Sequence, residues 1–169
     1  MYRVTEIIQN VLETGDLPDE WYLQRGIALH ACIALELQKK KYKTDERLGN
    51  YLVAAKKWIK DFKPEIIFIE QKLECERFNL CGTPDLVCKL GNTRHVVDFK
   101  TNQISWWHKY QLGGYALLLK ENLKPVLAGM IVALKDDGTY KIEQHNDVCP
   151  IMHAFRAMVT VYNIKKTKQ

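Results

Sequence analysis

The chain has 169 residues, a length that fits a single folded domain over residues 1–169 with its own hydrophobic core. Hydrophobic residues make up 47% of the sequence, and no apolar run approaches the roughly 18–20 residues that a membrane-spanning helix needs, so no membrane association is expected. The net charge of +5 permits a nucleic-acid partner, although many unrelated enzymes share this balance.

The cysteines argue against two kinds of site. There are five of them, and no two form a C-x-x-C pair. This pattern favours neither a disulfide framework nor a cysteine zinc site. We therefore expect reduced thiols in an intracellular, cytoplasmic protein. Glu6, Glu13 and Asp16 argue against an N-terminal targeting segment.

Helical periodicity dominates the first third of the chain. Pro18 lies near the first turn of a long predicted helix, where its missing N–H does no harm. In the same helix Leu23, Ile27, His30 and Ala34 recur on one face. Three helices are predicted here, at residues 4–14, 18–41 and 45–62.

The pattern then changes to that of strands. Residues 65–76 are rich in isoleucine and phenylalanine. Residues 83–90 and 94–101 flank Gly91 and Asn92, a pair typical of a hairpin turn. These three strands are expected to form an antiparallel meander.

The rest of the chain alternates between the two patterns. A helix is predicted at 106–122, a hairpin with strands at 126–135 and 140–145, and a closing helix from about 147. The order α-α-α-β-β-β-α-β-β-α predicts one mixed α/β domain.

Asp98 and Lys100 are charged residues on a strand that otherwise looks buried. Because side chains alternate along a strand, both point to the same face. The hairpin can bring Asp85, thirteen residues earlier, beside Asp98. Adjacent carboxylates repel each other unless a cation lies between them, and such oxygen ligands suit Mg²⁺ or Mn²⁺. A simple salt bridge between Asp98 and Lys100 is the alternative.

These residues resemble a nuclease signature. "GTPD" followed by "VVDFKT" is similar to the motif of the PD-(D/E)xK nuclease superfamily. Together with two further motifs, the chain resembles the RecB-like or phage-type exonuclease branch over about residues 20–135. The motifs are, in chain order, Gly26-x-x-x-His30, Gly82-x-x-Asp85, Asp98-x-Lys100 and Gln111-x-x-x-Tyr115.

The resemblance implies a restriction-endonuclease-like α-β-β-β-α-β core, with a central mixed sheet flanked by helices, and one or two Mg²⁺ or Mn²⁺ ions. Asp85 would share the ions, and Asp98 would bind the first with the backbone carbonyl of Phe99. His30 would reach a second ion, although a lone histidine on an apolar helix face is more often a core residue. Lys100 would orient or activate the attacking water.

Three further residues are candidates for the catalytic site. Glu70 is an acid on the face of a strand that carries apolar residues, so it would bind an ion, donate or accept a hydrogen bond with a ligand, or lie solvated at the strand end. Gln111 and Tyr115 are four apart and share a helix face. Gln111 would contact a phosphate or base, and Tyr115 would orient Lys100 or the scissile phosphate; an ordinary helix seam is the alternative.

A second group is expected to contact DNA. Thr101 and Asn102 follow the D-x-K motif and would bind a phosphate through hydroxyl or backbone N–H groups. Trp106 and Trp107 would stack on unpaired bases, with Lys109 beside them, unless at least one tryptophan is a core residue. The "KKKYK" run at 39–43 would follow a phosphate backbone or end a helix in solvent.

One departure from the family bears on cofactors. A subgroup of RecB-like nucleases holds an iron–sulfur cluster with one cysteine before the G-x-x-x-H histidine and three near the C-terminus. Here no cysteine precedes His30 and only Cys149 lies near the C-terminus, so no iron–sulfur cluster is expected.

The function expected from the resemblance is a metal-dependent deoxyribonuclease. It would be an exonuclease acting on DNA ends in recombination, repair or phage DNA processing, working with a separate helicase or recombination partner or as a homo-oligomer. A structure-specific endonuclease, a catalytically silent DNA-binding or assembly protein and a small-molecule metalloenzyme are the alternatives.

Overall fold

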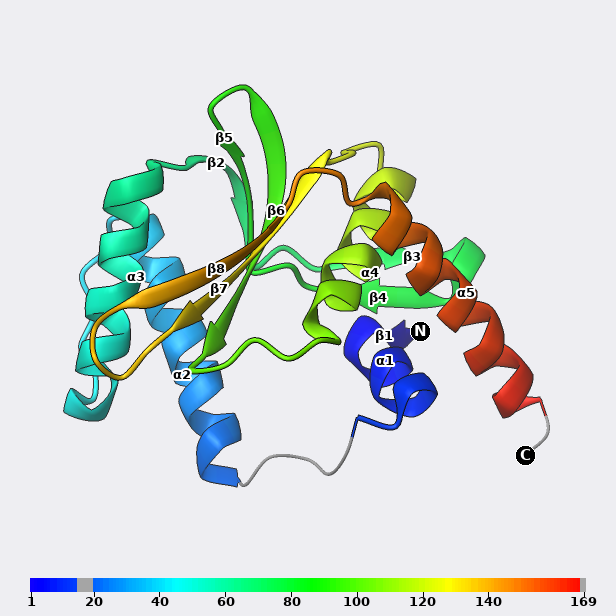
Figure 1. Cartoon of the computed structure of the whole chain (residues 1–169), viewed down its shortest axis with the longest axis horizontal. Coiled ribbons are helices and arrows are strands. Elements are labelled where there is room, and N and C mark those ends of the chain that lie inside the picture. Colours follow the sequence, from blue (N-terminus) through cyan, green and yellow to red (C-terminus); the bar gives the residue numbers. More distant parts are fainter. Residues whose placement is uncertain (15–19, 168–169) are drawn as a thin grey trace.

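A central mixed sheet lies between two groups of helices in the computed structural model, which describes residues 1–14 and 20–167 (Figure 1). The strands of this sheet are, in spatial order, β2 (Glu65–Ile69), β5 (Leu86–Leu90), β6 (Thr93–Thr101), β7 (Ala128–Leu134) and β8 (Tyr140–His145). β6 and β7 pair in parallel, and the other neighbours are antiparallel. The predicted antiparallel arrangement of β2, β5 and β6 is therefore confirmed.

A smaller sheet lies beside the central one. Its strands are, in order, β1 (Tyr2–Arg3), β4 (Leu80–Gly82) and β3 (Leu73–Cys75). The helices are α1 (Val4–Leu12), α2 (Glu20–Leu37), α3 (Gly49–Phe62), α4 (His108–Glu121) and α5 (Cys149–Lys166), with short 3₁₀ turns at η1 (Glu46–Leu48) and η2 (Glu76–Phe78).

The two faces of the central sheet are buried against different helices (Figure 1). On β6, Val97 and Phe99 belong to the core cluster with α2 and α3, where the ring of Phe99 packs edge-on against Trp58. Val96 points to the other face and joins the cluster with α1, α4 and α5. Asp98 has the same parity as Val96, so strand alternation turns it toward α4.

The predicted strand 65–76 is wrong as a single element. β2 ends at Ile69, and Glu70 has a left-handed backbone with φ of 49°. This conformation turns the chain out of the central sheet, so that β3 pairs in the smaller sheet instead. The next predicted strand, 83–90, begins only at Leu86, because Pro84 has no N–H to contribute to a ladder.

The predicted periodic face of α2 lies partly in solvent. Leu29 and Ile33 are buried, whereas Leu23 and Ile27 are 49% and 58% exposed. The helix ends at Leu37 rather than near residue 41, and Lys39 has a left-handed φ of 56°. Pro18, Gly15 and Asp16 lie outside the described residues.

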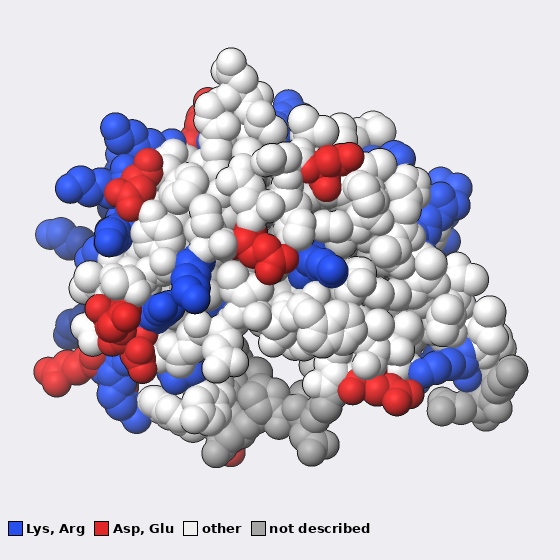
Figure 2. All heavy atoms as spheres, in the orientation of Figure 1, with Lys and Arg blue, Asp and Glu red and all other residues white. Residues whose placement is uncertain are grey.

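The hydropathy of the helices and the charge of the surface are two further features of the described residues. Within residues 1–14 and 20–167, no helix is both long enough and apolar enough to cross a membrane. Figure 2 shows lysine and arginine side chains gathered at the edge of the molecule over α3. The predicted helix at 106–122 starts at His108, so Trp106 and Trp107 lie in the loop before α4.

Candidate active site

Asp85 and Asp98 meet where β5 begins. The pairing of Leu86 with Val97 places Asp85, the residue before β5, opposite Asp98. From Asp98 onward β6 pairs with β7 alone, which leaves its other side open. Here the Phe99 N–H donates to Oδ2 of Asp85 at 2.7 Å. Because the N–H and C=O of one residue point to the same side of a strand, the Phe99 carbonyl also faces this opening.

Asp98 has the most deeply buried charged side chain of the site. Its side chain is 0% exposed, and neither carboxylate oxygen accepts a hydrogen bond of good geometry. Lys100 Nζ lies 2.7 Å from Oδ2 as an ion pair. Burial raises the pKa of Asp98 to about 6; Lys100 opposes this rise and Asp85 adds to it. The buried pair of oxygens is therefore suited to a further cation.

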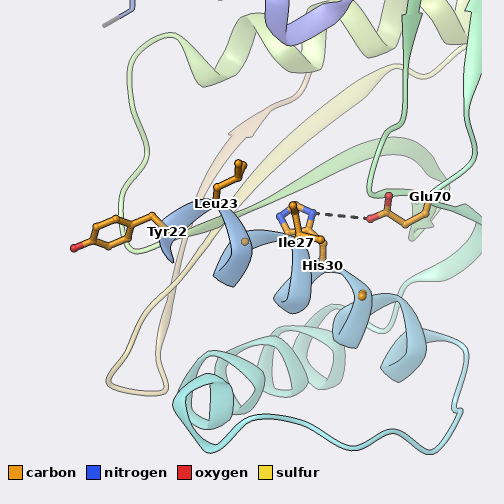
Figure 3. A pocket seen from close by; sticks show the side chains of 7 residues that line it. Tyr22, Leu23, Ile27, His30 and Glu70 are labelled. Carbon is orange, nitrogen blue, oxygen red and sulfur yellow. Dashed lines mark ion pairs between the residues drawn. The ribbon is translucent and has the colours of Figure 1, made fainter. Parts of the chain in front are cut away.

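His30, Glu70 and Asp85 form a cluster with metal-ligand spacing. One ligand atom from each lies within 4.8 Å of the other two. His30 Nδ1 is 3.0 Å from Oδ1 of Asp85 and 3.9 Å from Oε1 of Glu70. Figure 3 shows His30 on α2 facing Glu70, which lies just beyond the end of β2. The structure thus brings together three residues that are 40 and 15 positions apart in sequence.

The electrostatics of this cluster favour bound protons or a cation. Burial by itself would lower the pKa of His30, but the Asp85 carboxylate raises it to about 9. Burial and the charge of Asp85 raise the pKa of Glu70 to about 7. Burial opposes ionisation of Asp85, yet His30 and Lys100 bring the pKa of Asp85 below its usual value. A divalent ion would neutralise the same carboxylates.

Glu70 owes its position to a strained backbone. A non-glycine residue at φ of 49° is disfavoured, and its N–H is fixed by a 3.2 Å hydrogen bond to the Asp85 carbonyl. This turn directs the Glu70 side chain toward His30 rather than along the sheet (Figure 3).

A hydrogen-bonded chain positions Lys100. Its Nζ donates to Oε1 of Gln111 at 2.9 Å, and Nε2 of Gln111 donates to the Tyr115 hydroxyl at 2.8 Å. Burial raises the pKa of Tyr115 well above its usual value, so the phenol stays protonated. Gln111 therefore contacts the lysine directly, and Tyr115 acts on Lys100 through Gln111.

The residues expected to contact DNA differ in their surroundings. Trp106 is 63% exposed, whereas Trp107 packs against the cluster of α4 and α5. Asn102 has φ of 63° and its N–H is bound to the Leu134 carbonyl. Lys109 lies over the Tyr110 ring at 5.4 Å. Of the two tryptophans, Trp106 is thus exposed and Trp107 belongs to the edge of the core.

Sequence reasoning missed Arg25. Its guanidinium lies over the Tyr51 ring at 5.2 Å and donates to Oγ1 of Thr101 at 3.3 Å. Its buried Nε has no hydrogen-bond partner among the described residues. The sequence feature that could have identified Arg25 is its position directly before Gly26 in "RGIALH".

His108 was missed as well. Its Nδ1 accepts a hydrogen bond from the Ser105 N–H at 3.0 Å, which leaves the ring proton on Nε2. Burial and the charge of Lys100 lower the pKa of His108 to about 3, so the ring is neutral. Nothing in the surrounding "WWHKY" distinguished this histidine in the sequence.

Comparisons with known proteins show which solved structures share the fold of this chain. No family model and no curated protein matches the chain. The crystal structure of LHK-Exo in complex with dAMP superposes with a TM-score of 0.54 at 10% identity, covering 96% of this chain and 86% of that one.

Two other solved structures are more distant. An alkaline exonuclease (LHK-Exo) from Laribacter hongkongensis gives a TM-score of 0.42 at 11% identity, with coverage of 99% and 93%. SSO0001 gives 0.40 at 16% identity, with coverage of 94% and 84%. The likeness to the dAMP complex of LHK-Exo shows that the chain shares the fold of that protein, with the central mixed sheet flanked by helices that the sequence predicts.

Proposed function

We propose that this protein is a divalent-metal-dependent nuclease that hydrolyses DNA from its ends. One observation carries the proposal: the fully buried carboxylate of Asp98 accepts no hydrogen bond of good geometry and lies beside the cluster of His30, Glu70 and Asp85. Lys100 compensates part of this charge at Oδ2 of Asp98. Removing the remaining carboxylate charge from water costs several kcal/mol unless a further cation compensates it. A phosphodiester bound at this place would meet both a metal site and Lys100.

The donor set fits a hard divalent cation. Asp85, Asp98 and the Phe99 carbonyl offer oxygen ligands, Glu70 offers another, and His30 offers an imidazole nitrogen. Mg²⁺ and Mn²⁺ prefer such oxygen-rich sites. When bound, the ion supplies charge neutralisation at the phosphate and a water of lowered pKa.

The chain's own cations would hold the substrate. Asp98 and Gln111 keep Lys100 in one position, from which it donates to the attacking water or to a phosphate oxygen. Arg25, beside Thr101, provides a second positive group for a neighbouring phosphate.

DNA ends are the proposed substrate because of the structural neighbour. LHK-Exo is described as an alkaline exonuclease and was solved in complex with dAMP. The choice between ends and internal positions depends on whether the surface admits a continuous duplex, and the catalytic residues serve either reaction.

The test is an end-labelled linear duplex beside its covalently closed circle, each incubated with Mg²⁺ or Mn²⁺. We expect degradation of the linear form alone, abolished by EDTA and in Lys100→Ala. Lys89→Ala is the matched control, because Lys89 pairs with Glu65 on the surface away from the cluster. Cleavage of the circle would indicate an endonuclease instead of an exonuclease. Absence of metal-dependent cleavage of both substrates would overturn the proposal.

A further inference from the structure

A groove of about 610 Å³ lies along α2 and ends at the candidate metal site. Its apolar wall is formed by Tyr22, Leu23 and Ile27, which are 52%, 49% and 58% exposed. His30 and Glu70 line its other end; Figure 3 shows Leu23, Ile27 and His30 along α2 and Glu70 facing His30 from outside the helix. The volume falls within the ~300–1,000 Å³ range of small-ligand sites.

Gly26 lines this groove without a packing reason to be glycine. A Cβ built at Gly26 would meet no atom within 4 Å. By contrast, a Cβ at Gly113 of α4 would come within 2.6 Å of the Ile151 carbonyl, and one at Gly114 within 2.5 Å of Val4. Glycine destabilises a helix interior relative to alanine. At Gly26 its effect is to keep the groove open beside His30.

We propose that this groove binds an unpaired base of the nucleotide next to the scissile phosphate, so that the substrate is a single-stranded or frayed DNA end. The inference rests on the proposed nuclease function. A base in the groove would be adjacent to the metal cluster, because His30 and Glu70 belong to both.

The chemistry of the wall fits a base better than a phosphate or a sugar. The faces of a base are apolar and stack on aromatic side chains whatever its sequence. Arg25 lies over the Tyr22 ring at 4.8 Å and holds that aromatic at the groove, with its charge available to the strand's phosphate. A base paired in a duplex cannot enter, since it would first have to leave the stack.

The test uses a single-stranded oligonucleotide with 2-aminopurine at its end, bound to the full chain in Ca²⁺ so that binding is read without hydrolysis. We expect a change of 2-aminopurine fluorescence on binding to the unmodified chain. Gly26→Leu fills the groove and should weaken binding by roughly tenfold, the worth of one stacked base, and abolish the change. Ala28→Leu is the matched control: Ala28 is exposed on the same helix outside the groove, and its affinity should stay within about twofold.

Ile27→Ser is the second variant. It removes apolar wall at an exposed position and should weaken binding in the same direction, whether or not Gly26→Leu folds fully. Unchanged binding and fluorescence in both variants would overturn the proposal. So would equal, Gly26-dependent binding of a fully paired blunt duplex, or a concentration-dependent dimer that only Gly26→Leu abolishes, since the groove would then hold a second copy.

The two proposals fail separately. Base binding that depends on Gly26, with no hydrolysis under Mg²⁺ or Mn²⁺, would support base binding in the groove and contradict the proposed nuclease activity. Hydrolysis of DNA with no effect of Gly26→Leu on binding would support the nuclease activity and contradict base binding in the groove.

Discussion

The backbone N–H of Phe99 donates a hydrogen bond to Oδ2 of Asp85 at 2.7 Å, across the gap left where β5 begins. The other oxygen of Asp85 is 3.0 Å from His30. Asp85 therefore connects β6 with α2 and forms the point on which the candidate site is assembled.

The hydrogen bond between Phe99 and Asp85 should be measurable as stability. Asp85→Ala and Asp85→Asn both remove the charge, but only asparagine retains an acceptor for the buried N–H. We expect the alanine variant to be less stable than the asparagine variant by about 1–3 kcal/mol, the cost of an unsatisfied buried donor. Urea unfolding of both variants in EDTA measures the difference; equal midpoints would contradict it.

The contact between Gln111 and Lys100 should affect turnover more than substrate binding. Gln111→Leu removes the amide oxygen that accepts a hydrogen bond from Nζ of Lys100, and it leaves the ion pair of Lys100 with Asp98 in place. We expect kcat to fall by roughly 10²-fold with little change in KM, as for loss of a group that positions a catalytic residue.

Tyr115→Phe should have a smaller effect in the same direction, because it acts through Gln111. Gln144→Leu is the control, since its bond is to Asn146 next to β8. A rise in KM alone would assign Gln111 to substrate binding instead.

Asp98→Asn should stabilise the metal-free protein in a pH-dependent way. The pKa of Asp98 is raised from 3.8 to about 6 by burial, so the folded state binds the proton more readily than the unfolded chain. The carboxylate therefore penalises folding increasingly as the pH rises from about 4 through 6. Asparagine carries no charge, so its advantage should be largest above pH 6 and small at pH 4.

Unfolding of both forms in EDTA at pH 4 and pH 8 makes that comparison. In the variant the ammonium of Lys100 has no carboxylate partner at residue 98. This loss reduces the stability advantage of Asp98→Asn without reversing its pH dependence. An advantage that is larger at pH 4 than at pH 8 would contradict the expected sign.

A divalent ion should stabilise the folded chain. At a Mn²⁺ concentration of 100 times its Kd, linkage predicts about 2.7 kcal/mol, or a rise in Tm of roughly 5–10 °C for a chain of this length. Mn²⁺ should bind more tightly than Mg²⁺ because one ligand is an imidazole. The rise should be lost in His30→Ala and kept in His145→Ala, whose histidine pairs with Glu143 outside the cluster.

The same binding should weaken as the pH falls. The pKa of Glu70 is about 7 and that of His30 about 9, so protons compete with the ion over this range. Calorimetric titration with Mn²⁺ at pH 6 and pH 8 measures the competition; equal affinity at both values would exclude Glu70 and His30 as ligands.

Gly26→Ala should raise stability. The position has no left-handed φ and has open space for a methyl group, so the helix gains up to ~1 kcal/mol. A higher midpoint in urea would support the view that packing does not require glycine there. A lower midpoint would assign Gly26 a structural role.

Local patterns determined much of the candidate site from the sequence. The two-residue turn at Gly91 and Asn92 sets the register of its hairpin, and that register places Asp85 opposite Asp98. Strand alternation puts Asp98 and Lys100 on one face, where their charged groups are 2.7 Å apart. Both results follow from geometry within one hairpin, so no contact with another part of the chain was needed to predict them.

Tertiary contacts decided the rest. The face of α2 that is buried depends on α3 and the sheet, which cover Leu29 and leave Ile27 open at the groove. The left-handed turn at Glu70 and the contact between Arg25 and Thr101 each bring together segments distant in sequence. Periodicity identifies a helix and its apolar residues, but only packing against partners determines which of them leave water.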